Sequence, residues 1–452
     1  MSTIEKHDMT QGKILLPLVS FTIPLVLGNL FQLTYNAADS VIVGKYVGEQ
    51  ALAAVGTSTP IMNIAILLIS GMCMGASVLM SSQYGAKVYD TLSRQISTTM
   101  LAGCGFSVVF SLLMLLLANP VLRLIRVPET AIPEAAAYLR IIFMGLIFTF
   151  MYNFLANTMR ALGDSKTPLY FLLFSAGLNI VLDLVLIIVF HLGAAGAAYA
   201  TVIAQGVSAL LCLVYIIKKV PILKLDRWDF KLDGHLVRQQ LAIGFPMALQ
   251  YSITAIGAMM VQAALNVLGS VHVAAFTAAN KIEQVATQVY VALGTTMATY
   301  CAQNMGAGKV KRISRGFRAT TIMGSIYSVV FGVLVFFFGN MLTGLFVSEN
   351  LDQIVGLVDI YMKCVALFFI PLNVVNVYRN GIQGMGYGFL PMTAGIAELA
   401  GRGLTAVVAS HYKSYLGICL ASPVAWIFAS ALLLVMYFGI MNKYKKAGNF
   451  RE

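Results

Sequence analysis

The sequence predicts an all-α integral membrane protein with twelve transmembrane helices in two parallel six-helix lobes. Three observations lead to this fold: an apolar composition, twelve apolar runs of membrane-spanning length, and an internal repeat at a spacing of about 222 residues. Of the 452 residues, 59% are hydrophobic and only 11% are charged, whereas a soluble globular domain has about 25% charged residues. The composition therefore excludes an ordinary soluble protein.

The twelve apolar runs are close to the ~20 residues that an α-helix needs to cross ~30 Å of hydrocarbon. We predict spans at residues 14–38, 51–75, 96–118, 135–157, 168–190, 194–217, 240–266, 273–300, 317–340, 358–380, 389–410 and 415–440. The runs are continuously apolar, which favours helices over the ~10-residue alternating segments of a membrane β-barrel. The segment before the first run is polar and shows no cleavage site, so we interpret that run as a span rather than a signal peptide.

The net charge of +12 indicates membrane topology rather than nucleic-acid binding. If the N-terminus is cytoplasmic, 20 of the 30 Lys and Arg residues fall in cytoplasmic segments, 4 on the opposite side and 6 inside spans. This asymmetry follows the positive-inside rule and predicts a multi-pass protein of the inner (plasma) membrane with both termini in the cytoplasm. The basic side would contact anionic lipid, and no nucleic-acid partner is expected.

The two halves of the sequence repeat each other in order. Pro24 matches Pro246, and the dipeptide Gly85-Ala86 matches Gly306-Ala307. Each half contains six predicted spans, an even number, so both halves enter from the same side. The repeats are then parallel and related by a pseudo-twofold axis along the membrane normal. We predict an N-terminal six-helix lobe at residues 1–217, a cytoplasmic linker at 218–238 and a C-terminal six-helix lobe at 239–452.

Proline and glycine inside the predicted spans indicate where helices bend or approach each other. Pro24 and Pro246, at matching positions, would bend the first helix of each lobe because proline lacks the backbone N–H that continues the hydrogen-bond ladder. We interpret both as candidate hinges, with an ordinary kink as the alternative. Gly71-x-x-x-Gly75 would let two helices approach closely.

Two carboxylates lie where an ionised group is costly. Asp39 closes the first apolar run, and Asp183 lies deep inside the run 168–190. An ionised side chain at the bilayer centre costs at least ~2.5–3.5 kcal/mol, so it usually faces a cavity or a partner. Asn179 precedes Asp183 by four residues and therefore shares its helical face, and Thr201 falls at a similar depth in the next span.

This set of side chains predicts a site for a cation or a proton. Asn36 and Asn153 are further polar candidates for the same site. Two carboxylates held together away from water repel each other when both are ionised, so one of them could take up and release a proton. The same oxygen-rich set could instead bind Na⁺, at Asp39 and Asp183. A buried hydrogen-bond network between helices is the structural alternative.

The C-terminal half carries its own charges inside spans. Lys281 and Glu283 are two residues apart and so face different directions, whereas Glu398 and Arg402 are four apart, in the favourable order for an ion pair on one helix. We take Lys281, Glu283 and Glu398 as candidate residues of a substrate cavity, because an acid there could attract a cationic substrate. A structural ion pair is the alternative interpretation of Glu398.

The sequence contains no motif for nucleotide hydrolysis or for catalysis. It has no G-x-x-x-x-G-K-[ST] loop, no H-E-x-x-H and no zinc-ligand spacing. Neither enzymatic activity nor a cofactor is therefore expected, apart from a coupling ion, H⁺ or Na⁺.

Several motifs resemble those of the multidrug and toxic compound extrusion (MATE) transporters, over nearly the whole chain. They are Asp39-Ser-Val-Ile-Val-Gly44 and Arg160-Ala-Leu-Gly-Asp-Ser-Lys-Thr-Pro168. Asn179-Ile-Val-Leu-Asp183 is similar to the fifth-helix signature of DinF-like and archaeal members, which suggests the DinF-like bacterial branch. The resemblance implies secondary active efflux of small organic cations or amphipathic drugs in exchange for H⁺ or Na⁺, by alternating access.

The resemblance also implies a coupling-ion site in the N-terminal lobe, formed by Asp39, Asn179, Asp183 and Thr201. We expect the protein to work as a monomer in the lipid bilayer. A flippase for a lipid-linked glycan or cell-wall precursor is the alternative, because larger relatives of this architecture resemble such proteins. A flippase needs cationic residues in its central cavity, for which Lys281 and Arg402 are the main candidates.

Overall fold

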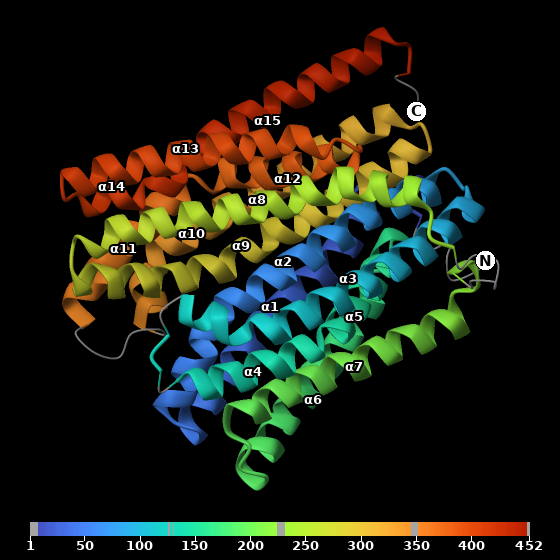
Figure 1. Cartoon of the computed structure of the whole chain (residues 1–452). Helices are drawn as coiled ribbons and strands as arrows, with labels where there is room; N and C mark the ends of the chain where they lie inside the picture. Colours follow the sequence, from blue (N-terminus) through green and yellow to red (C-terminus); the bar gives the residue numbers. More distant parts are fainter. Residues whose placement is uncertain (1–7, 125–126, 130, 224–230, 345–350, 450–452) are drawn as a thin grey trace. The chain divides into compact units, whose positions relative to one another are not determined.

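The computed structural model describes residues 8–124, 127–129, 131–223, 231–344 and 351–449, which form helices joined by short turns (Figure 1). In the first half these are α1 (Leu15–Tyr46), α2 (Glu49–Gly85), α3 (Tyr89–Leu124), α4 (Ile132–Met144), α5 (Leu146–Ala161), α6 (Lys166–Leu184), the π-helix η2 (Val185–Val189) and α7 (Gly193–Lys219). The second half follows with the 3₁₀-helix η3 (Pro221–Leu223), α8 (Gly234–Asn266), α9 (Ser270–Gly306), α10 (Val310–Gly344), α11 (Leu351–Leu367), α12 (Phe369–Gly384), α13 (Phe389–His411), α14 (Tyr415–Cys419) and α15 (Ala421–Lys446).

The helices confirm the predicted fold class. Each of the twelve predicted runs falls on one helix, or on consecutive helices that together form one span. Among the described residues, eight helices are long and apolar enough to cross a membrane, and ten spans are reached when each of two bent pairs counts as one.

Both bends interrupt predicted spans that the sequence showed as continuous. Helices α4 and α5 meet at 46° and helices α11 and α12 at 51°. At the first bend a Cβ on Gly145 would lie 2.3 Å from a methyl group of Val202 in α7, so only glycine allows this approach. At the second bend Pro371 lies in the first turn of α12, where its missing N–H leaves the preceding helix without a continuing hydrogen bond.

The chain divides into two compact units. Unit 1 contains Leu27–Phe245, and unit 2 contains Met9–Val26 together with Pro246–Glu452. The start of α1 thus belongs to unit 2, and the start of α8 belongs to unit 1, which differs from a simple division at the predicted linker 218–238. The unit boundary crosses α1 two residues after Pro24 and crosses α8 directly before Pro246.

In unit 2, the segment that leads into α1 is held by hydrogen bonds to α9 and α10. The backbone N–H of Met9 donates to Oε1 of Gln303 at 3.0 Å. The Arg312 guanidinium donates three hydrogen bonds of 2.8–3.2 Å to carbonyl oxygens within residues 9–12, and Nζ of Lys309 donates a fourth at 2.9 Å. Contacts with helices of the second half therefore explain why the start of α1 groups with unit 2.

In unit 1, the start of α8 is held by α2 and α3. The Thr99 hydroxyl donates to Oε1 of Gln240 at 3.0 Å. A Cβ on Gly75 would lie 2.7 Å from the backbone of Gly244, and a Cβ on Gly244 would lie 2.6 Å from the Gly71 carbonyl oxygen. This backbone contact confirms that Gly71-x-x-x-Gly75 allows two helices to approach closely.

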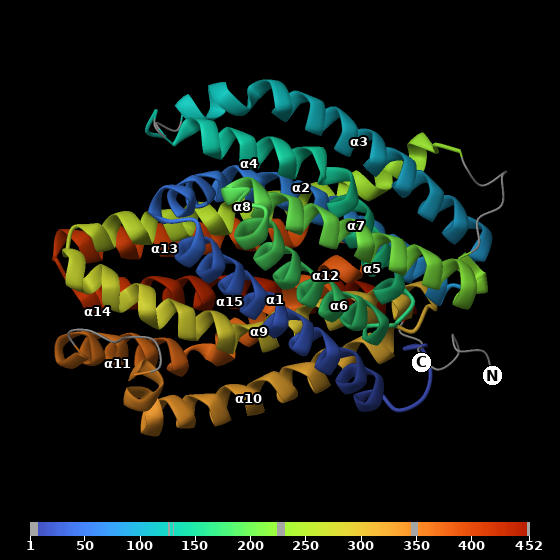
Figure 2. The same cartoon turned by 90° about the horizontal axis from the view of Figure 1, so that it is seen from below.

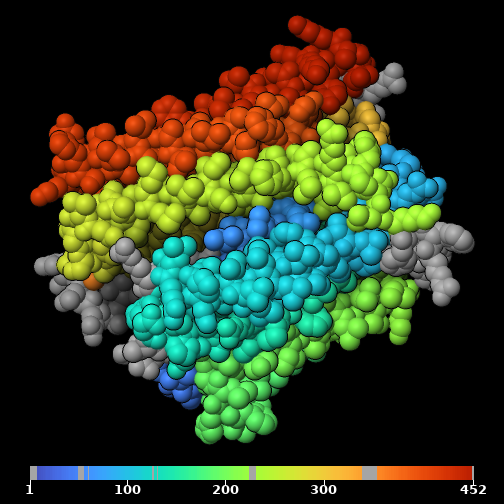
Figure 3. Space-filling model, in the orientation of Figure 1, coloured from blue at the N-terminus to red at the C-terminus, as the bar shows by residue number. Residues whose placement is uncertain are grey.

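Each unit packs its helices side by side (Figures 1 and 2). Apolar side chains are exposed on the outside of each unit. In unit 1, α7 packs against α4, α5 and α6; in unit 2, α9 packs against α10, α11 and α12. The surface of α3, cyan in Figure 3, carries Val109 and Leu116 with 67% and 79% of their surface exposed. Apolar exposure on this scale suits contact with lipid rather than with water.

Candidate functional site

The two membrane acids meet in unit 1. Asp39 comes from α1 and Asp183 from α6, and their carboxyl groups lie close enough to interact electrostatically. Asp183 is completely buried. Both of its carboxyl oxygens, and Oδ1 of Asp39, are buried and receive no hydrogen bond, and no Lys, Arg or His of the described residues pairs with either acid. The pair thus presents buried oxygen acceptors without a donor or a cation.

Asn179 lies one helical turn before Asp183 on the same face of α6. Its side chain is buried, and neither its amide nitrogen nor its amide oxygen has a hydrogen-bond partner. Directly after Asp183 and Leu184, the α-helix changes into the π-helix η2. Such π-turns are rare and occur frequently at functional sites, because the wider turn displaces the side chains around it.

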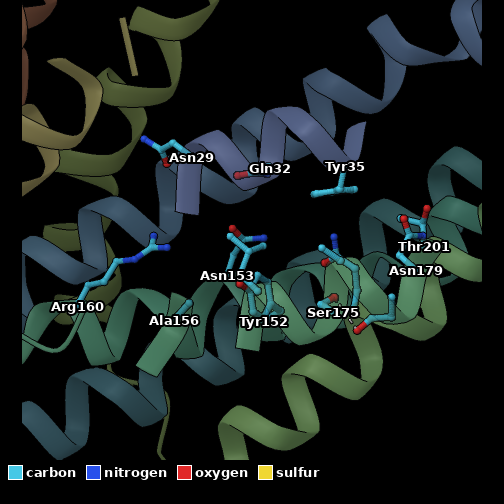
Figure 4. A pocket seen from close by; sticks show the side chains of 14 residues that line it. Asn29, Gln32, Tyr35, Tyr152, Asn153, Ala156, Arg160, Ser175, Asn179 and Thr201 are labelled. Atoms are coloured by element: carbon cyan, nitrogen blue, oxygen red, sulfur yellow. Dashed lines mark hydrogen bonds between the residues drawn. The ribbon is translucent and has the colours of Figure 1, made fainter. Parts of the chain in front are cut away.

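A cavity of about 150 Å³ lies within unit 1 beside these residues (Figure 4). Helices α1, α5, α6 and α7 form its wall. The lining side chains are Asn29, Gln32 and Tyr35 from α1, Tyr152, Asn153, Ala156 and Arg160 from α5, Leu172, Ser175, Ala176 and Asn179 from α6, and Thr201, Ala204 and Gln205 from α7.

The lining follows from helical spacing. On α6 the lining residues recur at intervals of three and four, which places them on one face of the helix. Tyr35 is one turn before Asp39 on α1, and Asn179 is one turn before Asp183 on α6. The acid pair therefore adjoins the cavity through Tyr35 and Asn179, one residue from each helix that carries an acid.

The structure brings together most of the predicted coupling-ion residues. Asn153, Asn179 and Thr201 line the cavity, next to the pair of acids. The Thr201 hydroxyl donates to the Ala197 carbonyl oxygen, which leaves its oxygen lone pairs available. Asn36 is exposed and is not part of the lining.

Sequence reasoning missed several residues of this cavity. Gln32 and Tyr35 precede Asp39 by seven and four residues, so the helical spacing from Asp39 was a usable signal for both. Arg160 lies outside the predicted span 135–157, whereas the structure places it in the last turn of α5 and in the cavity wall. Gln205 follows Thr201 by four residues on α7, a spacing that also could have identified it.

The candidate residues of unit 2 have a different environment. Glu398 lies between two guanidinium groups, with its carboxylate oxygens 2.6 Å from Nη2 of Arg379 and 2.7 Å from Nη2 of Arg402. The pair with Arg402 is the structural alternative foreseen from the sequence, and Arg379 on α12 is an addition. Glu283 accepts a hydrogen bond from the hydroxyl of Tyr361, and Lys281 is exposed.

Comparison with known proteins identifies the family. The MatE family model matches residues 24–185 and 242–408, a large part of both halves. This chain belongs to the MATE family. Its members are transporters rather than enzymes, so the chain is a multi-pass membrane transporter.

Among its relatives in this family is the probable multidrug resistance protein YpnP of Bacillus subtilis. That protein is 35% identical over 383 residues, which are 84% of each chain. The multidrug export protein MepA of Staphylococcus aureus is 23% identical over 388 residues, 86% of this chain and 82% of MepA.

Solved MATE structures have the same fold. MATE in the straight conformation superposes with a TM-score of 0.92 at 20% identity, over 99% of this chain and 100% of that one. MATE in complex with MaL6 gives a TM-score of 0.91 at 21% identity, over 97% and 99% of the two chains. This likeness supports the twelve-helix, two-lobe architecture that the sequence predicted.

Proposed function

We propose that this protein exports small cationic or amphipathic organic compounds across the plasma membrane in exchange for H⁺ or Na⁺, with both termini in the cytoplasm. Relatives named for multidrug resistance and multidrug export support the substrate class. The distribution of Lys and Arg supports the orientation. These relatives do not favour the alternative of a flippase for lipid-linked precursors.

The observation that carries the proposed coupling is the pair of acids without a counter-ion. Buried polar groups in folded proteins nearly always have hydrogen-bond partners, and buried charges are paired. Asp39 and Asp183 have neither among the described residues, although both lie on helices packed inside a membrane protein. The simplest reason for retaining such a pair is that a transported cation completes it.

Both coupling ions fit the chemistry of this site. A hydrogen bond between two carboxyl groups needs one proton, which Asp39 and Asp183 would share. Na⁺ would instead take oxygen ligands, for which the carboxylates, the Asn179 amide and the Thr201 hydroxyl are suitable. The proposal therefore names the site and leaves H⁺ and Na⁺ to be distinguished by experiment.

Exchange follows if ion and substrate favour different conformations of the same region. Asn179 belongs both to the surroundings of the acids and to the lining of the cavity, so a change at one reaches the other directly. An ion that favours a conformation with low substrate affinity then drives substrate out, and the coupling is reciprocal. A proton falling through 100 mV delivers ~2.3 kcal/mol, enough for roughly tens-fold accumulation of a substrate without net charge.

The conformational change itself is proposed to occur at the candidate hinges. Pro24 and Pro246 lie inside α1 and α8, next to the two places where the chain passes from one unit into the other. A helix can bend at proline at low cost because the ladder is already interrupted there. Rocking of the units about these points would give alternating access.

Ethidium movement in proteoliposomes, with ΔpH and ΔNa⁺ imposed separately, tests the proposal. Wild type is compared with Asp39→Asn and with a matched control, Asp90→Asn, which alters an exposed acid in the first turn of α3. We expect one gradient to drive ethidium in wild type and in Asp90→Asn, and neither gradient to drive it in Asp39→Asn.

The other outcomes are also informative. Exchange that survives Asp39→Asn would contradict the site and direct attention to Glu283 as a coupling acid. If neither gradient moves ethidium in folded wild-type protein, efflux of organic cations is the wrong function.

A further inference from the structure

Arg160 is a cation in the cavity wall of unit 1 that has no counter-ion. Its Nε is buried and has no hydrogen-bond partner. Within the part of the chain that the structure describes, no carboxylate lies within ion-pair distance of its guanidinium. The ionisable groups near enough to act on its charge are Tyr152 and Cys212, both of types that are uncharged at pH 7.

Asp164, the acid nearest in sequence that could pair with Arg160, binds other groups. Asp164 follows Arg160 by four residues, but the turn at Gly163 (φ +90°) carries it onto the start of α6. There its Oδ1 accepts hydrogen bonds of 3.0 Å from the backbone N–H groups of Lys166 and Thr167, and its Oδ2 accepts one of 2.6 Å from the Thr167 hydroxyl. Asp164 is therefore a helix cap, which leaves Arg160 without a partner.

Helix geometry alone does not account for this arginine. A cation in the last turn of a helix gains about 0.3–1 kcal/mol from the helix dipole. An ionised group at the centre of the bilayer costs at least ~2.5 kcal/mol, and arginines in membrane segments usually pair or mark a substrate path. Among the described residues, the guanidinium of Arg160 donates no hydrogen bond to a carbonyl oxygen, so the usual capping role is not fulfilled.

The cavity has two ends of opposite character. Figure 4 shows Arg160 and Asn29 at one end, and Tyr35, Asn179 and Thr201 at the other. The second end adjoins the acids, because Asn179 and Tyr35 lie one turn from Asp183 and Asp39. Along α5, the seven residues from Asn153 to Arg160 cover about 10 Å at 1.5 Å per residue.

We propose that Arg160 binds the carboxylate of substrates that carry both a carboxylate and a basic nitrogen. The guanidinium offers a planar fork of N–H donors that matches a carboxylate. The basic nitrogen of such a zwitterion points toward the end of the cavity that adjoins the acids. The inference rests on the proposed export of organic compounds and narrows its substrate class to zwitterionic ones at this site.

A dye and its ester provide a matched pair for the test. Rhodamine 110 carries a free carboxylate, and rhodamine 123 is its methyl ester, so the two differ only in this group. Binding of each dye is measured by fluorescence polarisation with the full-length protein in phosphatidylcholine nanodiscs, with empty nanodiscs as the blank. The same two dyes are then followed in proteoliposomes under the gradient that drives ethidium.

We expect wild type to bind rhodamine 110 about tenfold more tightly than rhodamine 123, the effect of one charge-assisted hydrogen-bonded pair. In Arg160→Gln the ratio of the two affinities is expected to fall to about one, with less than a threefold change for rhodamine 123. Lys218→Gln removes an exposed cation at the end of α7 and is expected to keep the wild-type ratio.

Three results would overturn the inference: equal or tighter binding of the ester by wild type, an unchanged ratio in Arg160→Gln, or the same loss of ratio in Lys218→Gln. If Arg160→Gln does not fold, the test uses the ratio of the affinities for the two dyes in wild type and in Arg160→Lys. Lysine keeps the positive charge but lacks the planar fork of N–H donors. Failure of the proposed function is distinguishable, because then neither dye and no ethidium moves under either gradient.

Discussion

In unit 2 the carboxylate of Glu398 lies between two guanidinium groups, whereas in unit 1 the carboxyl groups of Asp39 and Asp183 face each other without a cation. The same contrast holds for arginine. Arg312 of unit 2 donates to three carbonyl oxygens, and Arg160 of unit 1 has no partner among the described residues. The two halves share a repeat but differ in whether their charged side chains have partners.

The difference separates charges that hold the fold from charges that await a ligand. A buried ion that is fully paired makes the structure depend on it, since removal of one partner leaves the other uncompensated. A buried ion without a partner weakens the structure and is kept where it binds something else. Substitutions in unit 2 should therefore reduce stability, and substitutions in unit 1 should reduce transport.

The largest effect is expected for Asp183→Asn. Because the amide cannot take up a proton and has no negative charge to balance Na⁺, ion-driven ethidium exchange should fall at least a hundredfold. The melting temperature should stay the same or rise, since a buried group without a counter-ion has become neutral. Exchange assays in proteoliposomes and thermal unfolding in detergent measure the two properties. A large loss of stability would contradict the proposed difference between the units, because Asp183 would then support the fold.

Glu398→Gln should show the reverse pattern. Without this carboxylate, Arg379 and Arg402 remain buried and unpaired, which costs about 3–5 kcal/mol. At 2–4 °C per kcal/mol for a unit of this size, the melting temperature should fall by about 10 °C. Exchange per folded molecule should change less than threefold, and Glu134→Gln, on an exposed acid of α4, serves as the control. Normal stability together with lost exchange would assign Glu398 to the substrate cavity.

Arg312→Gln should give a smaller loss of stability. The variant loses the guanidinium that binds the segment before α1, a group of charge-assisted hydrogen bonds that is partly exposed. We expect a loss of about 2 kcal/mol, or roughly 5 °C in melting temperature. Arg318→Gln, on an exposed arginine of the same helix, should change it by less than 1–2 °C. Equal effects of the two variants would show that the bound segment contributes nothing.

The smallest effect concerns the contact between Glu283 and Tyr361. A double-mutant cycle with Glu283→Gln and Tyr361→Phe should give a coupling energy of about 1–2 kcal/mol in thermal unfolding. A coupling near zero, with impaired exchange in Glu283→Gln, would place this acid beside Asp39 and Asp183 rather than beside Glu398. That outcome would remove the contrast between the units.

Most of the fold could be predicted from the sequence because lipid imposes a simple rule on it. Runs of about twenty apolar residues must be helices, and each predicted run falls on a helix or on consecutive helices. The bends were not predictable in this way. The bend at Gly145 depends on the approach of Val202, which lies more than fifty residues away in the sequence.

The candidate site was predicted where its residues are anomalous within a span. Asp39 and Asp183 stand out in apolar runs, and Asn179 and Thr201 follow from spacing and depth. Arg160 was not recognised, because an arginine at the end of a span is ordinary in sequence. The structure shows that α5 continues through Ala161, that Asp164 caps the next helix, and that Arg160 faces a cavity.

The start of α1 belongs to unit 2, so it can reach its final contacts only after much of the second half has been synthesised. Met9 bonds to Gln303, its partner 294 positions later in the sequence. A ribosome that adds about 5–20 residues per second needs roughly 15–60 s to reach that partner. During this time the first span lacks its contacts with the helices of the second half. Assembly of the second unit is therefore also the last step in completing the first helix.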